Sequence, residues 1–138
     1  MKKDLKVYVG YALTGASASF KNEAKAFQEA LGARGITVLD FWKPKDREAV
    51  EYCLERVGAS DAMIAIVSQA SFGLGYEVAT ALHQGKPVLM LAHSRYGTSQ
   101  FATENPHPKA EFDTFTTSEE LLLKSMAFLE KVSAPNGS

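Results

Sequence analysis

Hydrophobic residues along this 138-residue chain form short continuous runs, separated by longer stretches in which apolar positions recur with helical spacing. The short runs cover residues 5–10, 36–42, 62–67, 87–92 and 111–115. Their β-branched and aromatic residues, with glycine or proline nearby, predict five strands. The run 62–67 (AMIAIV) is apolar at every position, which indicates a strand buried on both faces at the centre of a parallel sheet.

The stretches between these strands predict helices. The first helix is expected to begin after Ser17 and Ser19, because serine is a good N-cap residue. Its inward residues would be Phe20, Ala24, Phe27 and Leu31. A second helix is expected within residues 46–60, after a proline turn at 43–45. Its inward residues would be Val50, Leu54 and Val57.

The second half of the chain predicts two more helices. One follows the stretch 68–76 and stops at Gly85, and residues 93–109 are polar and read as a loop. The last helix would start with a capping box formed by Thr117 and Glu120. Its inward residues would be Leu121, Leu122, Met126 and Leu129.

Strands and helices alternate along the whole chain, which predicts a parallel sheet with helices on both faces. We therefore expect a single-domain three-layer α/β/α sandwich with a five-stranded, mainly parallel sheet of the Rossmann or flavodoxin-like kind. The domain would cover residues 1–132, and residues 133–138 (SAPNGS) would form a disordered tail. Ligands of such open sheets bind at the carboxyl ends of the strands. We therefore expect the functional residues in the loops after the first, third and fourth strands.

Composition narrows the classes of function. The formal net charge of -1 provides no basic excess for nucleic-acid binding. The single cysteine, Cys53, excludes an intramolecular disulfide and a thiolate metal cluster, and no histidines and carboxylates have metal-site spacing. The start, MKKDLKVYVG, resembles neither a signal peptide nor a membrane span. We expect a cytoplasmic protein with no metal, no cofactor and no membrane partner.

The stretch SQASFGLGYE, residues 68–77, carries the clearest chemical signal. Gly73 and Gly75 permit close backbone approach, and Ser71 offers a hydroxyl beside the free amides of a helix N-terminus. These features favour a phosphate site, although the glycines alone are also typical of a tight turn. Glu77 is expected in the first helical turn, where the helix dipole would keep it ionised as a nucleophile towards a sugar carbon. A glutamate there is equally typical of a simple favourable charge at the dipole.

This stretch resembles a motif of the nucleoside 2-deoxyribosyltransferase superfamily, most closely its 2′-deoxynucleoside 5′-monophosphate N-hydrolases. The motif is Gln69-x-Ser71-x-Gly73-x-Gly75-Tyr76-Glu77, preceded by Asp61 and the apolar run and followed by GKPVLML. The opening residues Tyr8 to Gly15 (YVGYALTG) are similar to the family's opening loop, Y-x-A-G-P-L-T-G. The resemblance spans residues 5 to about 92.

The resemblance implies roles for the matching positions. Glu77 would be the nucleophile that captures the anomeric carbon, and Ser71 and Gly73 would bind the 5′-phosphate. The residues implied to line the substrate pocket are Tyr8, Leu13, Thr14 and Gly75. Asp61 is first of all expected to anchor the start of its strand, with a pocket role second. His93 would face the pocket, and is otherwise an exposed loop histidine. The family also completes its sites from a neighbouring subunit, which implies at least a homodimer with Ser99 as the candidate contributor.

Two positions depart from the family pattern. Tyr11 stands where the family has glycine, so its ring would stack on the ligand or intrude on it. Cys53 stands where the family has an aspartate that helps to protonate the departing base. Glu51, or Glu55, is the candidate acid-base if the helix is offset, and Cys53 is otherwise a small core residue. Phe41 and Trp42 are further candidates for stacking on a base, although packing in the core or at the rim of the pocket is the more typical role of such residues.

Three functions follow. The first is hydrolysis of the N-glycosidic bond of a (deoxy)nucleoside 5′-monophosphate to free base and sugar 5-phosphate through a glutamyl-glycosyl intermediate. The second is transfer of the sugar to another base through the same intermediate. The third is a catalytically impaired nucleotide-binding module. A flavodoxin-type carrier is disfavoured, because TGASAS after the first strand is a weak phosphate loop.

Overall fold

The computed structural model describes residues 4–13, 15–40 and 48–134. Thr14, Phe41, Trp42, the expected turn at 43–45 and the end of the expected tail lie outside the described residues. The elements in chain order are β1 (Lys6–Tyr11), α1 (Ala18–Ala33), β2 (Thr37–Leu39), α2 (Ala49–Gly58), β3 (Ala62–Ile66), α3 (Phe72–His83), β4 (Val88–Ala92), α4 (Gln100–Thr103), β5 (Ala110–Thr114) and α5 (Ser118–Ser133). No helix within these ranges is both long and apolar enough to cross a membrane.

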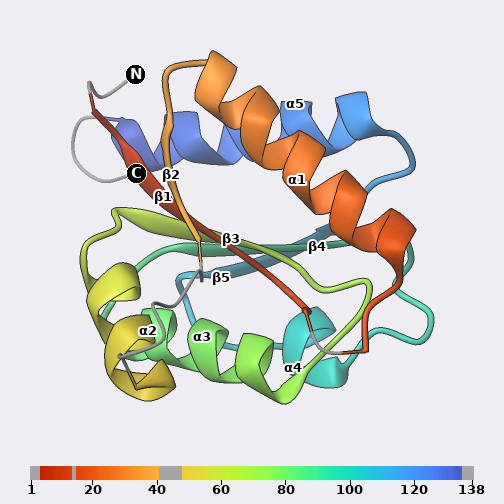
Figure 1. Ribbon diagram of the computed structural model, residues 1–138, viewed down its shortest axis with the longest axis horizontal. Coiled ribbons are helices and arrows are strands. Elements are labelled where there is room, and N and C mark those ends of the chain that lie inside the picture. The colour runs from red at the N-terminus through yellow and green to blue at the C-terminus, as the bar shows by residue number, and fades with distance from the viewer. Residues whose placement is uncertain (1–3, 14, 41–47, 135–138) are drawn as a thin grey trace.

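The strands form one five-stranded sheet in the order β2-β1-β3-β4-β5, and every described pairing is parallel. Helices α1 and α5 cover one face, and α2, α3 and α4 cover the other (Figure 1). The predicted three-layer α/β/α fold is therefore confirmed. Strand order reverses between β1 and β3, so the crevice expected for a ligand lies at the carboxyl ends of these two strands.

Alternate residues of each strand point into different halves of the core. Ile64 and Ile66 of β3 pack under α1 and α5, whereas Met63 of the same strand packs under α2 and α3. In β1 the same alternation directs Tyr8 to the α2 and α3 side. The position of a residue along its strand, odd or even, thus determines which face of the sheet its side chain lies on.

The expected inward faces of α1 and α5 are confirmed. Ser17 caps α1 by accepting a hydrogen bond from the backbone N of Phe20 at 3.2 Å. The buried residues of α1 are Phe20, Ala24, Phe27 and Leu31. In α5, Leu122 is only partly buried, and Phe128 joins the core in addition to the three other predicted residues.

The expected inward face of α2 is wrong in two positions. Cys53 and Val57 are buried, whereas Val50 is 53% exposed and Leu54 is 43% exposed. Cys53 and Val57 lie four residues apart and share one side of the helix, while Leu54 is turned by about 100° from Cys53. Val50 lies in the first turn, at the carboxyl edge of the sheet, where it borders a cavity instead of a strand.

Residues 93–109, expected to be a loop, contain the short helix α4. Its N-cap is Ser99, whose hydroxyl accepts a hydrogen bond from the backbone N of Phe101 at 3.2 Å. Ala102 is the buried residue of this single turn, and it joins the half of the core under α3. Four residues are too few for a helical period to show in the sequence.

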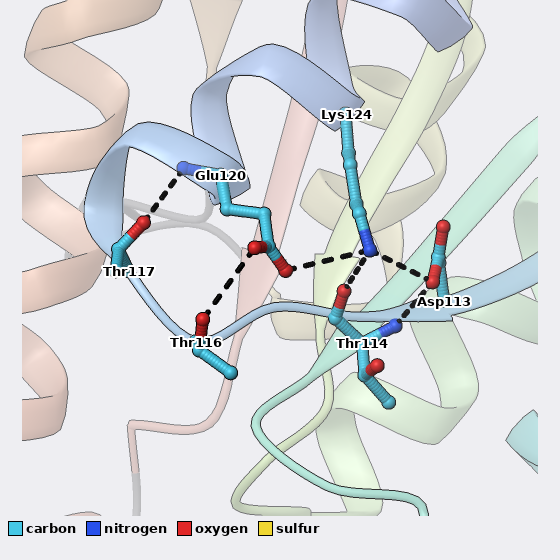
Figure 2. A network of polar contacts seen from close by, with 6 residues as sticks. All are labelled: Asp113, Thr114, Thr116, Thr117, Glu120 and Lys124. Atoms are coloured by element: carbon cyan, nitrogen blue, oxygen red, sulfur yellow. Dashed lines mark hydrogen bonds and ion pairs between the residues drawn. The ribbon is translucent and has the colours of Figure 1, made fainter.

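A polar network joins the start of α5 to the end of β5 (Figure 2). The Thr117 hydroxyl caps α5 by accepting from the backbone N of Glu120 at 3.1 Å. The Glu120 carboxylate accepts a hydrogen bond from the Thr116 hydroxyl and pairs with Lys124 at 3.5 Å. Lys124 also donates to Asp113 at 3.1 Å, so one ammonium group connects the helix to the strand.

Gly10 of β1 allows α3 to approach the sheet closely, so we expect Gly10→Ala to destabilise the fold. A Cβ at this position would lie 2.6 Å from Met63 Cε, 3.0 Å from Leu74 Cδ1 and 3.4 Å from Glu77 Oε1. Overpacking of this kind costs about 1–3 kcal/mol of unfolding free energy. Urea denaturation measures the loss.

The matched control is Gly32→Ala in α1, where a Cβ would meet no atom within 4 Å. Alanine should leave stability unchanged or raise it by up to ~1 kcal/mol at this helical position. Equal urea midpoints for the two variants would contradict a close approach at Gly10.

Candidate active site

A cavity of about 640 Å³ opens at the carboxyl edge of the sheet, beside the crevice between β1 and β3. Three segments enclose it: the end of β1, the first two turns of α2 and the N-terminal half of α3. Its lining residues are Tyr11, Leu13, Ala49, Val50, Cys53, Ala70, Ser71, Phe72, Gly73, Leu74, Tyr76 and Glu77. The described lining is therefore largely apolar and aromatic, and it contains one carboxylate, that of Glu77.

The stretch predicted as a glycine-rich loop is the beginning of α3. The helix starts at Phe72, so Gly73 and Gly75 are helical residues, and neither has a positive φ. Glu77 consequently lies in the second turn, and the expectation of a first-turn position is wrong. Ser71 explains the early start, because its hydroxyl caps the helix by accepting from the backbone N of Leu74 at 3.2 Å.

The Glu77 side chain is held in place by Tyr8, a residue of strand β1. The Tyr8 hydroxyl donates a hydrogen bond to Glu77 Oε2. Tyr8 is fully buried and Glu77 is 7% exposed, although Glu77 still borders the cavity. Gly10 lies on the same side of β1 as Tyr8 and leaves space beside Glu77 Oε1. One carboxylate oxygen is thus fixed, while the other has room beside it.

Burial is the largest cause of the pKa shifts of both Glu77 and Tyr8. It raises the pKa of Glu77 to about 7, and the hydrogen bond from Tyr8 opposes part of that rise. We expected the helix dipole to keep the carboxylate ionised, but Glu77 is instead divided between its two protonation states near neutral pH. Burial, followed by the charge of Glu77, raises the pKa of Tyr8, so the phenol stays a proton donor.

Cys53 faces the same cavity from α2. Burial and then the charge of Glu77 raise the pKa of its thiol to about 11, so the thiol is neutral near pH 7. Glu51, the predicted acid-base residue, is exposed on α2 and is not among the lining residues. The structure therefore brings Cys53, and not Glu51, to the cavity that holds Glu77.

The two residues predicted to bind phosphate border the same cavity as Glu77. Ser71 uses an acceptor lone pair for the helix cap, which leaves its O–H free to donate to a ligand. The position that a Cβ of Gly73 would occupy has no atom within 4 Å. The first amides of α3 point out of the helix at this end, where an anion is favoured.

Four of the other predicted residues border two different cavities. Tyr11 and Leu13 line the cavity with Glu77. Gly75 and Ser99 instead border an apolar cavity of about 370 Å³ between α3 and α4, which meets the first one at Ser71.

Asp61 and His93 lie away from Glu77. Asp61 lies at the amino end of β3, where its carboxylate accepts from the backbone N of Lys6 at 2.9 Å. This contact fits an anchor of the strand start, and it places Asp61 at the opposite edge from the cavity. His93 lines a separate polar cavity on the α1 side and contacts Glu23 at 3.1 Å.

Sequence reasoning missed Phe72 and Tyr76, which line the cavity, and the contact between Tyr8 and Glu77. The spacing from the Ser71 cap would have shown that Phe72 begins a helix and that Tyr76 follows one turn later. The Tyr8 contact joins residues 69 positions apart, and only the register of β1 against α3 creates it. Over the described ranges, no group of three or more His, Cys, Asp or Glu side chains is arranged to hold a metal ion.

Comparison with known proteins finds a protein that is similar in sequence and several solved structures that are similar in fold. No protein-family model matches the chain. A protein of Thermofilum pendens named "Putative 2′-deoxynucleoside 5′-phosphate N-hydrolase 1" is 34% identical over 98 residues, which cover 64% of this chain and 68% of that protein. The solved Clostridium botulinum CMP N-glycosidase BcmB is similar in fold, with a TM-score of 0.66 and 15% identity over 88% of this chain and 98% of its own. A designed Rossmann 2x3 protein has a TM-score of 0.56 and 17% identity over 97% of this chain and 92% of its own.

The raised pKa of Glu77 predicts that folding stability depends on pH. Because the folded state binds this proton more tightly than the unfolded chain, the stabilisation is complete below about pH 4.5 and is lost as the pH rises to 7 and above. Between pH 4.5 and 8, wild type should lose roughly 3 kcal/mol of unfolding free energy relative to Glu77→Gln. Urea unfolding at several pH values gives this difference.

Tyr8→Phe provides the companion measurement. It removes the contact that lowers the Glu77 pKa, so the loss of stability should begin at the same pH and continue to a higher one. A difference between wild type and Glu77→Gln that stays flat with pH would show that Glu77 is not desolvated.

Proposed function

Because this chain belongs to the nucleoside 2-deoxyribosyltransferase superfamily and is related to its 2′-deoxynucleoside 5′-phosphate N-hydrolases, we propose that it is a nucleotide N-glycosidase. It would hydrolyse the N-glycosidic bond of (deoxy)nucleoside 5′-monophosphates, giving free base and sugar 5-phosphate. The observation that carries this proposal is the Glu77 carboxylate, which accepts a hydrogen bond from Tyr8 and borders a cavity also lined by Ser71 and Gly73.

In the first step, the ionised Glu77 attacks the anomeric carbon. Tyr8 holds Oε2, so Oε1, beside Gly10, is the oxygen that forms the new C–O bond. The C–N bond breaks through a transition state with oxocarbenium character, and its electron pair leaves with the base. The departing base takes up one proton from solvent. The hydrogen bond from Tyr8 orients the nucleophile throughout and maintains a population of the charged form.

In the second step, water attacks the anomeric carbon and the bond to Oε1 breaks. Glu77 returns to a carboxylate, and the water loses one proton to solvent. If a free base occupies the cavity before water attacks, the same intermediate transfers the sugar to that base. Hydrolysis and transfer therefore differ only in the second nucleophile.

The substrate's phosphate would lie at the start of α3. The Ser71 hydroxyl can donate to it, and Gly73 has no side chain to block its approach. The helix dipole stabilises the negative charge at this end. Since Ser71 and Glu77 lie 6 residues apart on one helix and border one cavity, a single nucleotide can engage both.

A nucleotide-binding module without turnover is the second candidate. The position of Cys53 favours it, because a neutral thiol lines the cavity on the α2 side where an acid would assist the departing base. This candidate predicts that nucleotides raise the melting temperature while no base is released.

Incubation with ribo- and deoxyribonucleoside 5′-monophosphates and the matching nucleosides tests the proposal. Chromatography should detect free base from some phosphorylated substrate, and Glu77→Gln should lower its release by at least about a thousandfold. Ser71→Gly removes the hydroxyl but weakens the helix cap by only a few tenths of a kcal/mol. It should raise KM about tenfold for nucleotides and change KM much less for the matching nucleosides, since only nucleotides carry the phosphate.

Base release that survives Glu77→Gln would contradict the nucleophilic role. Equal effects of Ser71→Gly on nucleotides and nucleosides would contradict the phosphate role. Adding a free base separates the two enzymatic alternatives, because only a transferase gives a new nucleotide. Thermal stabilisation without release would support the binding module.

We also propose that the chain forms a homodimer through α3 and α4. Phe101 is 88% exposed beside the apolar cavity between these helices, and Phe72, the first residue of α3, is 93% exposed. A protruding ring and an apolar hollow on one face can fill each other across a two-fold axis. Ser99 borders this hollow, so a second copy would bring its Ser99 towards the start of α3.

Phe101→Lys should convert this dimer to a monomer, because it places a charge at the centre of the contact. The matched control is Tyr96→Lys, since Tyr96 is 95% exposed but borders the polar cavity on the α1 side. Sedimentation velocity distinguishes the two species. A wild-type monomer, or a Phe101→Lys dimer, would contradict the proposed interface.

A further inference from the structure

We propose that this site favours nucleotides whose base is cationic in the ring that carries the glycosidic nitrogen, as in an N-ribosylpyridinium or an N7-alkylated purine nucleotide. The inference rests on the proposed N-glycosidase function and names the substrate class of the same site. It follows from which side chains border the cavity and from what a departing base requires.

A neutral base leaves as an anion unless an acid protonates it, and a positioned acid contributes about 10²–10⁴-fold to the rate. Of the described residues lining the cavity, the ionisable ones are Tyr11, Cys53, Tyr76 and Glu77. Glu77 is the nucleophile, and the other three are phenols and a thiol. Glu51 is exposed on another side of α2. No second carboxylic acid, histidine or lysine borders the cavity within the described ranges.

A cationic base needs no such acid. When Glu77 Oε1 bonds to the anomeric carbon, the electron pair of the breaking C–N bond moves onto the ring nitrogen. That pair cancels the positive charge, so a neutral pyridine or a neutral N7-alkylated purine departs without taking up a proton. Water then releases the sugar phosphate, and its proton passes to solvent. The reaction consumes one cationic nucleotide and one water and yields one base, one sugar phosphate and one proton.

The cavity also suits a positive ring. Tyr11, Phe72 and Tyr76 present aromatic side chains to it, and aromatic faces attract cations. Lysine and arginine are absent from its lining over the part of the chain that is described. A cation close to Glu77 favours the charged form of the carboxylate and therefore lowers its pKa. The substrate itself would thus increase the ionised fraction of a nucleophile that burial holds near half protonation.

The test compares matched pairs of nucleotides. The cationic probes are nicotinamide mononucleotide, 7-methylguanosine 5′-monophosphate and its 2′-deoxy form, and the neutral controls are GMP and dGMP. After subtraction of spontaneous release, kcat/KM for a methylated nucleotide should exceed that of its parent by at least about 100-fold. Glu77→Gln should abolish release from both members of the pair.

Two Cys53 variants sharpen the comparison. Cys53→Asp supplies a carboxylic acid that burial keeps protonated, so it should reduce the cationic-to-neutral ratio at least about tenfold. Cys53→Ser supplies no acid and should keep the ratio. For wild type with a cationic substrate, the acid limb of kcat should lie at lower pH than that of kcat/KM, because only the complex contains the cation.

The possible outcomes separate the two proposals. Glu77-dependent release that is equal or faster from GMP or dGMP would overturn the preference for cationic bases and leave the N-glycosidase function intact. An unchanged ratio in a folded Cys53→Asp variant would also overturn it. No Glu77-dependent release from any nucleotide would defeat the proposed function itself.

Discussion

The hydrogen bond between Tyr8 and Glu77 is the interaction on which the rest of the site depends. A carboxyl group removed from water is costly unless a donor meets it, and Tyr8 supplies that donor from inside the sheet. The contact requires α3 to lie close against β1, which Gly10 permits because it has no Cβ. The Ser71 cap then fixes where α3 begins, and therefore where Glu77 falls along the helix. Four residues on two segments, β1 and the capped α3, thus position the oxygen that we propose to be the nucleophile.

Much of the fold could be read from the sequence because its signals are local and repeated. The apolar run 62–67 predicted the central strand, and the spacing in α1 and α5 predicted their buried faces. The failures have physical reasons as well. Gly73 and Gly75 suggested a loop, but one serine cap and the packing of α3 on the sheet outweigh two weak helix formers. The exposure of Val50 depends on a cavity, which no local pattern reveals.

The candidate site was predictable only where the family motif and the edge of the sheet agreed. Ser71, Gly73 and Glu77 follow β3 and meet in one cavity, as the motif implies. Asp61 precedes the same strand, so a parallel sheet carries it to the opposite edge. His93 does lie at the carboxyl edge, yet it lines the cavity on the α1 side of the sheet, together with Ser68 and Gln69, which follow β3. Position along the chain identifies the edge, but the direction of the side chain identifies the face.

Burial would have two opposing effects on Glu77 in its proposed role as a nucleophile. Desolvation makes the charged carboxylate less stable and hence more reactive, but it also reduces the fraction that is charged near neutral pH. Tyr8 restores part of that fraction without adding a formal charge, whereas a lysine or arginine partner would stabilise the carboxylate further and would repel a cationic base. The described groups around Glu77 are a neutral hydrogen-bond donor, Tyr8, and the aromatic rings of the cavity. The charge of a bound ligand would therefore have a large effect on the ionised fraction of Glu77. If Glu77 is the nucleophile, as proposed, the charge of the substrate would decide what fraction of it is ionised.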